Sequence, residues 1–276
     1  MDKYLVKQLG IFKVGAIASV SFTLGMLLHL KLEPSYSTKL AKENQALNDA
    51  IAQINAQAEA IPPAFSVPAR FQGKTFYDVK LAKNEKVVAL TLDDGPKIPE
   101  TPQILDILQE NNVKATFFVV GKAVEVYPQT MRRIVAEGHA IGNHTWHHWY
   151  RPMSLAIARS EIERTAEIIQ QTTGVKTELF RPPGGFLNNG LATYAKSQKH
   201  AVVMWSVIAP DTNPRATPEA FVQNVLKGTR PGAIVLLHDG GGDRRRTVKA
   251  LPPIIRGLRQ RGYRFVTLPE LLNLSK

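Results

Sequence analysis

Short apolar runs alternate with helical segments from about Lys80 to the C-terminus. The helical segments are predicted at Thr101–Asn111, Pro128–Glu137, Ser154–Thr172, Pro218–Lys227 and Val248–Arg261. The strands are predicted at Val87–Leu92, Ala115–Val119, Thr177–Phe180, Ala201–Trp205, Ala233–Leu237 and Tyr263–Val266. Most of these strand runs are continuously apolar instead of alternating, which is typical of a parallel sheet covered by helices. An open doubly wound sheet and a (β/α) barrel both fit the pattern.

The N-terminal part of the chain contains a hydrophobic segment, Val14–Leu30, that has no Asp, Glu, Lys or Arg and lies between Lys13 and Lys31. As a helix it spans about 26 Å, slightly less than a bilayer core of about 30 Å. It predicts a membrane anchor over residues 1–35. A cleaved signal peptide is the alternative, but no small-residue cleavage site follows the segment directly.

Residues 36–61 are predicted to form a helical stalk. Leu40, Leu47, Ile54 and Ile61 recur with heptad spacing, which is compatible with a short coiled coil that associates with a second copy. A single helix lying on the body fits equally well, because the segment has only the minimum length for a coiled coil. Residues 62–79 contain several prolines and are predicted to be a linker before a catalytic domain at 80–276.

Composition narrows the chemistry and the partners. The 276 residues are 44% hydrophobic and include no cysteine, which excludes disulfides, thiolate metal sites and cysteine nucleophiles. The net charge of +12 favours an anionic partner such as a phospholipid surface or an acidic polymer. We find no nucleic-acid-binding motif, and the compact basic run Arg244–Arg246 lies in a Gly-rich segment.

Polar residues come directly after the apolar runs. In parallel α/β proteins the active residues gather at these carboxyl ends of the strands. A short apolar stretch at 140–142 is followed in the same way by "NHTWHH". The residues that stand at these strand ends are Asp93, Asp94, His144, His148, Arg181, Asp211 and His238.

Two of these histidines have the spacing of metal ligands. His144 and His148 are four residues apart, so on a helix they would share one face. Together with Asp94 they make a set of two imidazoles and one carboxylate, which suits Zn²⁺, Co²⁺ or Ni²⁺ with one position left for water. Asp93 is then free to act as a base, and His147 is predicted to point away from the metal.

The remaining polar residues suggest partners for this centre. Arg181 is predicted to orient Asp93, and the N–H of Gly184 in "FRPPGGF" can be offered to an oxyanion. Amide hydrolysis requires a proton on the departing amine, and His238 suits that role, with Asp211 holding its ring.

The strings "TLDDGP", "HTWHH", "RPPGG", "WSVIAPD" and "LLHD" resemble, in this order, the motifs of the polysaccharide deacetylases (carbohydrate esterase family four, the NodB homology domain). The resemblance implies a distorted (β/α) barrel and metal-dependent removal of acetyl groups from N-acetylated sugars. By motif position it implies that Asp93 is the base and His238 the acid, and that Arg181 and Asp211 support them. It implies the metal ligands Asp94, His144 and His148, and the oxyanion donor Gly184.

This chain departs from the family pattern at several positions. Leu92 stands where Phe is usual, and Gly184 stands where Tyr is common. Ile208 replaces an acid and Thr212 replaces a Trp, which removes one aromatic wall of the sugar groove.

Taken together, the sequence predicts a single-pass membrane protein whose catalytic domain lies on the extracytoplasmic (periplasmic) side. Its expected substrate is the N-acetylglucosamine of peptidoglycan, with chitooligosaccharides and acetylated xylan as alternatives. A non-catalytic wall-binding scaffold is the alternative from another class, but the base, ligands and acid are all present. A nucleic-acid binder is the weakest interpretation.

Overall fold

The computed structural model describes Gln45, residues 65–81 and residues 85–276. The predicted anchor and, apart from Gln45, the predicted stalk lie outside these residues. No helix within the described part of the chain is long and apolar enough to cross a membrane. Residues 65–81 and 85–276 belong to one compact unit of the chain, which begins at Pro62.

The strands of this unit pair in parallel to form one sheet, in the order β1-β6-β5-β4-β3-β2-β8-β7, with β9 also paired to β2. The strands are β1 (Thr75–Phe76), β2 (Val87–Asp93), β3 (Thr116–Val119), β4 (Ala140–Asn143), β5 (Leu179–Phe180), β6 (Ala201–Val203), β7 (Val207–Ile208), β8 (Ala233–His238) and β9 (Arg264–Phe265).

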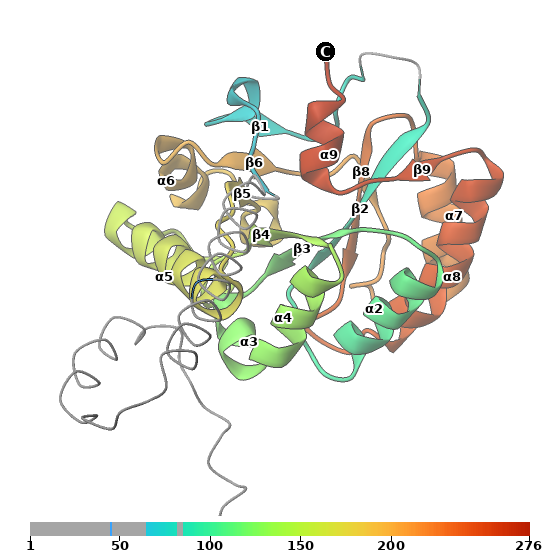
Figure 1. The fold of residues 1–276 in the computed structure, drawn as a ribbon, viewed down its shortest axis with the longest axis horizontal. Coiled ribbons are helices and arrows are strands. Elements are labelled where there is room, and N and C mark those ends of the chain that lie inside the picture. Colours follow the sequence, from blue (N-terminus) through green and yellow to red (C-terminus); the bar gives the residue numbers. More distant parts are fainter. Residues whose placement is uncertain (1–44, 46–64, 82–84) are drawn as a thin grey trace, which may run out of the picture. The chain divides into compact units, whose positions relative to one another are not determined.

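The sheet curls into an α/β half-barrel instead of forming an open doubly wound sheet (Figure 1). Strands β6 and β7 lie near opposite ends of the strand order, yet residues 204–206 connect them directly in the chain. This connection requires the two ends of the sheet to approach each other. The parallel half-barrel agrees with the barrel alternative that the apolar runs predicted.

Helices lie around the outside of the curled sheet (Figure 1). They are α2 (Glu100–Glu110), α3 (Gly121–Val126), α4 (Pro128–Ala136), α5 (Leu155–Thr173), α6 (Leu191–Ser197), α7 (Pro218–Gly228), α8 (Arg245–Gln260) and α9 (Leu268–Asn273). Helix α5 starts with the Ser154 side chain accepting the Ile157 N–H and ends at Gly174 in a left-handed conformation, so both ends are capped.

Strand β2 shows how this fold positions the chemistry. All of its side chains are buried, because helices cover one face and the interior of the curl covers the other. Val88, Leu90 and Leu92 belong to the core under the helices, whereas Val87 and Ala89 belong to the interior core. Side chains alternate along a strand, so the polar Thr91 and Asp93 continue the interior face.

The predicted elements are found with small shifts at their ends. Predicted helix Ser154–Thr172 is α5, and predicted strand Val87–Leu92 is β2, one residue longer than expected. The short elements α3, α6, β1 and β7 were not predicted, because segments of two to seven residues contain too little periodicity to be recognised.

Candidate active site

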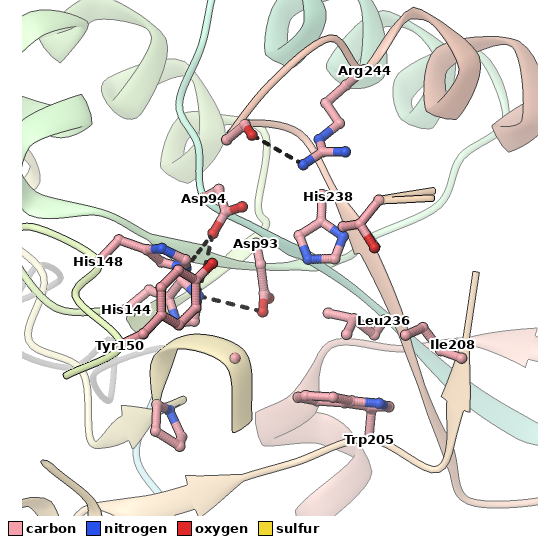
Figure 2. A pocket seen from close by; sticks show the side chains of 14 residues that line it. Asp93, Asp94, His144, His148, Tyr150, Trp205, Ile208, Leu236, His238 and Arg244 are labelled. Atoms are coloured by element: carbon pink, nitrogen blue, oxygen red, sulfur yellow. Dashed lines mark hydrogen bonds and ion pairs between the residues drawn. The ribbon is translucent and has the colours of Figure 1, made fainter. Parts of the chain in front are cut away.

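The candidate active site lies at the carboxyl ends of the strands, in a cavity of about 400 Å³. Figure 2 shows side chains from separate strand ends converging on it. The described residues that line it are Asp93, Asp94, His144, His148, Tyr150, Pro182, Gly184, Trp205, Ile208, Thr212, Leu236, His238, Gly241 and Arg244. Of the residues predicted from the sequence, only Arg181 and Asp211 lie behind this lining, and each contacts a residue that forms it.

Asp93 is fixed by a buried arginine. Arg181 is fully buried and its Nη1 donates to Asp93 Oδ1 at 2.6 Å and to the Thr91 hydroxyl at 2.9 Å. The same guanidinium donates to the carbonyls of Val203 and Met204, so it joins β2 to the end of β6. Since only one carboxylate oxygen is used by Arg181, Oδ2 remains directed towards His144, whose Nε2 lies 3.7 Å away.

Asp94, His144 and His148 form a cluster with the geometry of a metal site. Asp94 Oδ1 lies 3.3 Å from His144 Nε2 and 2.9 Å from His148 Nε2, and the three ligand atoms all lie within 4.8 Å of one another. His144 Nδ1 is 2.7 Å from the carbonyl of Arg181, which can only accept, so Nδ1 carries the proton. The lone pair of His144 Nε2 is therefore directed at the cluster, as in protein metal sites.

An unsatisfied atom shows that this cluster fits a cation. Among the described side chains, Asp94 Oδ1 is buried without a hydrogen-bond donor, although two imidazole nitrogens surround it. Burial by itself raises the pKa of Asp94, but His144 and His148 outweigh this effect and hold that pKa well below its usual range. A carboxylate oxygen facing two imidazole nitrogens is the donor set of a divalent transition metal.

His144 and His148 do not lie on a helix, and the helical explanation of their spacing is wrong. They lie in the loop after β4, in which Thr145 (φ 69°) and His148 (φ 61°) have left-handed conformations. These two turns fold the loop back, so that both rings reach Asp94. The Thr145 hydroxyl accepts the His148 N–H at 3.1 Å and stabilises the second turn.

A buried carboxylate on α5, which sequence reasoning missed, holds this loop. Glu161 Oε2 accepts the N–H groups of Trp146 and His147 at 3.1 and 2.8 Å, and Oε1 lies 2.5 Å from His147 Nδ1. His147 thus points away from the metal cluster, as predicted. A glutamate preceded and followed by helical residues has no distinguishing local pattern, so only the packing of α5 against the loop identifies it.

His238 and Asp211 form the second polar pair. Asp211 is 1% exposed, and its Oδ1 lies 2.8 Å from His238 Nδ1 while its Oδ2 accepts the His238 backbone N–H at 2.8 Å. Thr247 donates to the same Oδ2 at 3.0 Å. Burial lowers the pKa of His238, but the Asp211 carboxylate outweighs it, and the pKa is raised. The ring is thereby held with Nε2 free and is favoured in its protonated form.

Asp239 is a further buried acid at the site to which the sequence analysis gave no role. It accepts the Gly95 N–H at 3.2 Å and the Thr101 hydroxyl at 2.6 Å, which ties the end of β8 to the turn after Asp94. Burial and the charges of Asp94 and Asp93 raise the pKa of Asp239 to about 7, against the Thr101 hydrogen bond. A Cβ atom at Gly95 would lie 2.0 Å from this carboxylate, so the position requires glycine.

The basic run Arg244–Arg246 was placed by the sequence analysis in a Gly-rich segment, and its members contact the protein in three different ways. Arg244 is buried, and its guanidinium donates to the carbonyls of Gly240, Asp211 and Gly241. Helix α8 begins at Arg245, which pairs with Asp243. Arg246 donates to carbonyls between 213 and 216. Arg244 thus supports the site from within the protein, whereas Arg245 is exposed.

Gly184 lies at the edge of the cavity in a left-handed conformation (φ 61°). A Cβ atom there would lie 2.8 Å from the ring of Phe186 and 2.9 Å from the ring of Tyr150. The role of the Gly184 backbone N–H as an oxyanion donor stays a prediction. Tyr150 is a site residue that the sequence analysis missed.

This arrangement defines a class of protein. A buried carboxylate and a supported histidine flank a cluster of two histidines and one carboxylate that could hold a metal, which is the equipment of a metal-dependent hydrolase. Comparison with known proteins agrees, because the family model "Polysaccharide deacetylase" matches residues 80–203. The chain belongs to the polysaccharide deacetylase family, as the motifs indicated.

Individual relatives support this assignment. A peptidoglycan-N-acetylglucosamine deacetylase of Bacillus cereus is 40% identical over 195 residues, which cover 70% of this chain and 91% of that protein. The crystal structure of the Bc1960 peptidoglycan N-acetylglucosamine deacetylase aligns with a TM-score of 0.68 at 37% identity, over 74% of this chain and 95% of the other. A pseudoenzyme of the same family, BA3943 from Bacillus anthracis, aligns with a TM-score of 0.67 at 30% identity, over 74% and 70%.

Proposed function

We propose that this protein removes acetyl groups from the N-acetylglucosamine of peptidoglycan. One observation carries the proposal: Asp93 and His238 are register partners on adjacent strands and flank the Asp94–His144–His148 cluster in one cavity. The names of its relatives support the choice of polymer.

The chain's own residues divide the chemistry of amide hydrolysis between them. Asp93, with Oδ1 held by Arg181, presents Oδ2 to take a proton from the attacking water. His238, whose protonated form is favoured by Asp211, gives a proton to the departing sugar nitrogen. The N–H of Gly184 is placed at the cavity edge to donate to the acetyl oxygen as charge develops there.

Asp94, His144 and His148 would hold a divalent metal. Such an ion supplies a Lewis acid for the acetyl carbonyl and lowers the pKa of a water molecule from about 15.7 towards 7. We propose Zn²⁺, because two imidazoles, one carboxylate and an open position suit it, with Co²⁺ and Ni²⁺ as alternatives.

Acetate release tests the substrate. The metal-loaded protein should release acetate from peptidoglycan, and chitooligosaccharides and acetylated xylan should be assayed in parallel. Faster release from either alternative polymer would reassign the substrate within the family. Release from none of the three would refute the proposed function.

A non-catalytic wall-binding role is the second candidate, because a pseudoenzyme has a similar fold. The residues themselves discriminate between the two, since function depends on the site and not on the fold. Base, acid, metal cluster and both supporting residues lie together here, which favours the enzyme. Binding of peptidoglycan without acetate release, by protein with full metal content, would favour the scaffold.

We further propose that Val14–Leu30 anchors the chain in the cell membrane with the catalytic domain outside the cytoplasm. The uncharged segment and the location of acetylated wall polymers support this placement. Protease added to intact spheroplasts should digest the catalytic domain, and protection from the protease would contradict the orientation.

A further inference from the structure

Two exposed aromatic rings extend the site beyond the metal cluster. Tyr150 is 58% exposed and Phe186 is 45% exposed, and their ring centroids lie 6.0 Å apart in an edge-to-face arrangement. Tyr150 also lies edge to face with His148 at 5.0 Å. The rings therefore run outward without interruption from a metal ligand to the protein surface.

The missing side chain at Gly184 makes room for this pair. A Cβ atom at Gly184 would lie within 2.9 Å of both rings, so any larger residue would displace them. Tyr150 follows β4 and Phe186 follows β5, and these strands are neighbours in the sheet. The pair thus occupies the space next to the position where a tyrosine is common in the family.

The side of the cavity away from the metal ligands carries one aromatic ring, that of Trp205, which is partly buried against the interior core (Figure 2). The other labelled side chains there are aliphatic: Figure 2 shows Ile208 and Leu236 on the side away from His148 and Tyr150. Aliphatic side chains lack a flat face of the size of a sugar ring. The exposed rings beside the metal cluster are therefore the better surface for a pyranose.

We propose that Tyr150 and Phe186 form a sugar-binding platform for the polymer unit next to the one that is deacetylated. This inference rests on the proposed function. A pyranose has an apolar C–H face that packs on an aromatic ring, and large exposed apolar surfaces beside a pocket mark ligand grooves. The platform would bind the glycan chain without contacting the reacting acetyl group.

Kinetics on a long and a small substrate test the platform. In the zinc-loaded full chain, Tyr150→Ala and Phe186→Ala should each raise the KM for the N-acetylglucosamine pentamer and for soluble glycan strands by about threefold to tenfold. The kcat/KM for vinyl acetate, an activated ester without a ring, should stay at the wild-type value. Tyr150→Phe retains the ring and should retain the wild-type KM.

Val126→Ala is the matched control, because Val126 is 63% exposed and does not line the cavity. Ala variants whose KM values equal that of this control would overturn the platform while the proposed function stands. Loss of zinc from Tyr150→Ala would overturn it too, because the ring would then position His148. A wild-type protein that hydrolyses vinyl acetate but deacetylates neither glycan would refute the proposed substrate, and the platform with it.

Discussion

Asp93 and His238 are direct register partners on the parallel strands β2 and β8. Both side chains point to the interior face of the curled sheet, because Thr91 and Asp93 alternate with the core residues of β2, as Leu236 and His238 do on β8. Two titratable side chains that are distant in the sequence thus line one cavity. A register slip of one residue would turn either of them out of it.

Asp93→Asn should abolish turnover while the metal stays bound. An amide cannot take a proton from water, so kcat on an acetylated oligosaccharide should fall by about 10²–10⁴-fold. Metal content measured by atomic emission should equal that of the wild type, because Asp94, His144 and His148 are unchanged. Retained activity would remove Asp93 from the role of base.

His144→Ala should lose both the metal and the activity. The substitution removes one of the three ligand atoms that lie within 4.8 Å of one another, and the imidazole that faces Asp94 Oδ1. His238→Ala is the matched control, since it removes a histidine from the same cavity but outside the cluster. Equal metal content in the two variants would refute the ligand set.

His238→Ala should slow amide substrates far more than activated esters. A departing amine requires a proton, whereas the phenolate of an aryl acetate leaves without one, so the loss should be about 10²–10⁴-fold for N-acetyl sugars only. The ratio of kcat/KM values for the two substrates measures the effect. Similar losses on both would contradict the role of acid.

Asp211→Asn should change the pH profile in a defined direction. Asp211 raises the pKa of His238, and the proton donor must be protonated, so activity falls as the pH rises through that pKa. Removing the carboxylate charge lowers the pKa of His238, and the basic limb of the kcat/KM profile should move to lower pH. Asp106→Asn, which changes an exposed carboxylate paired with Arg133, should leave the limb in place. If the basic limb of the kcat/KM profile does not move in Asp211→Asn, then Asp211 does not support His238 in the reaction.

Glu161→Ala should weaken metal binding although Glu161 is not a ligand. It leaves the buried N–H groups of Trp146 and His147 without an acceptor, which costs about 1–3 kcal/mol of unfolding free energy for each group. The loosened loop should lower metal affinity by about 10- to 100-fold, the usual effect of losing a residue that orients ligands.

Glu163→Ala is the control for that measurement, because Glu163 lies on the same helix but is partly exposed and pairs with Arg159 and Tyr194 instead of the loop. Denaturant unfolding reports stability, and competition with a chelator reports metal affinity. Equal metal affinity in Glu161→Ala and Glu163→Ala would show that the loop holds its shape without Glu161.

Much of the site could be predicted from the sequence, because its residues stand directly at the ends of strands. The apolar run before Asp93 and Asp94, and the run before His238, identify buried strands, and parallel strands place their carboxyl ends on one side. The helix expected for His144 and His148 was wrong, because spacing of four residues does not distinguish a helix from a loop with two left-handed turns.

The sequence by itself determined the class of fold, the family and the chemical types that meet at the site. These follow from apolar runs and from polar residues directly after them, which are properties of short stretches of chain. Only the tertiary structure decided the register of Asp93 against His238. It also decided the hydrogen bonds from Glu161 to the loop after β4, and the pairing of Tyr150 with Phe186 beside Gly184. Each of these depends on packing between segments far apart in the chain, and no local pattern records which distant side chain will fill a given space.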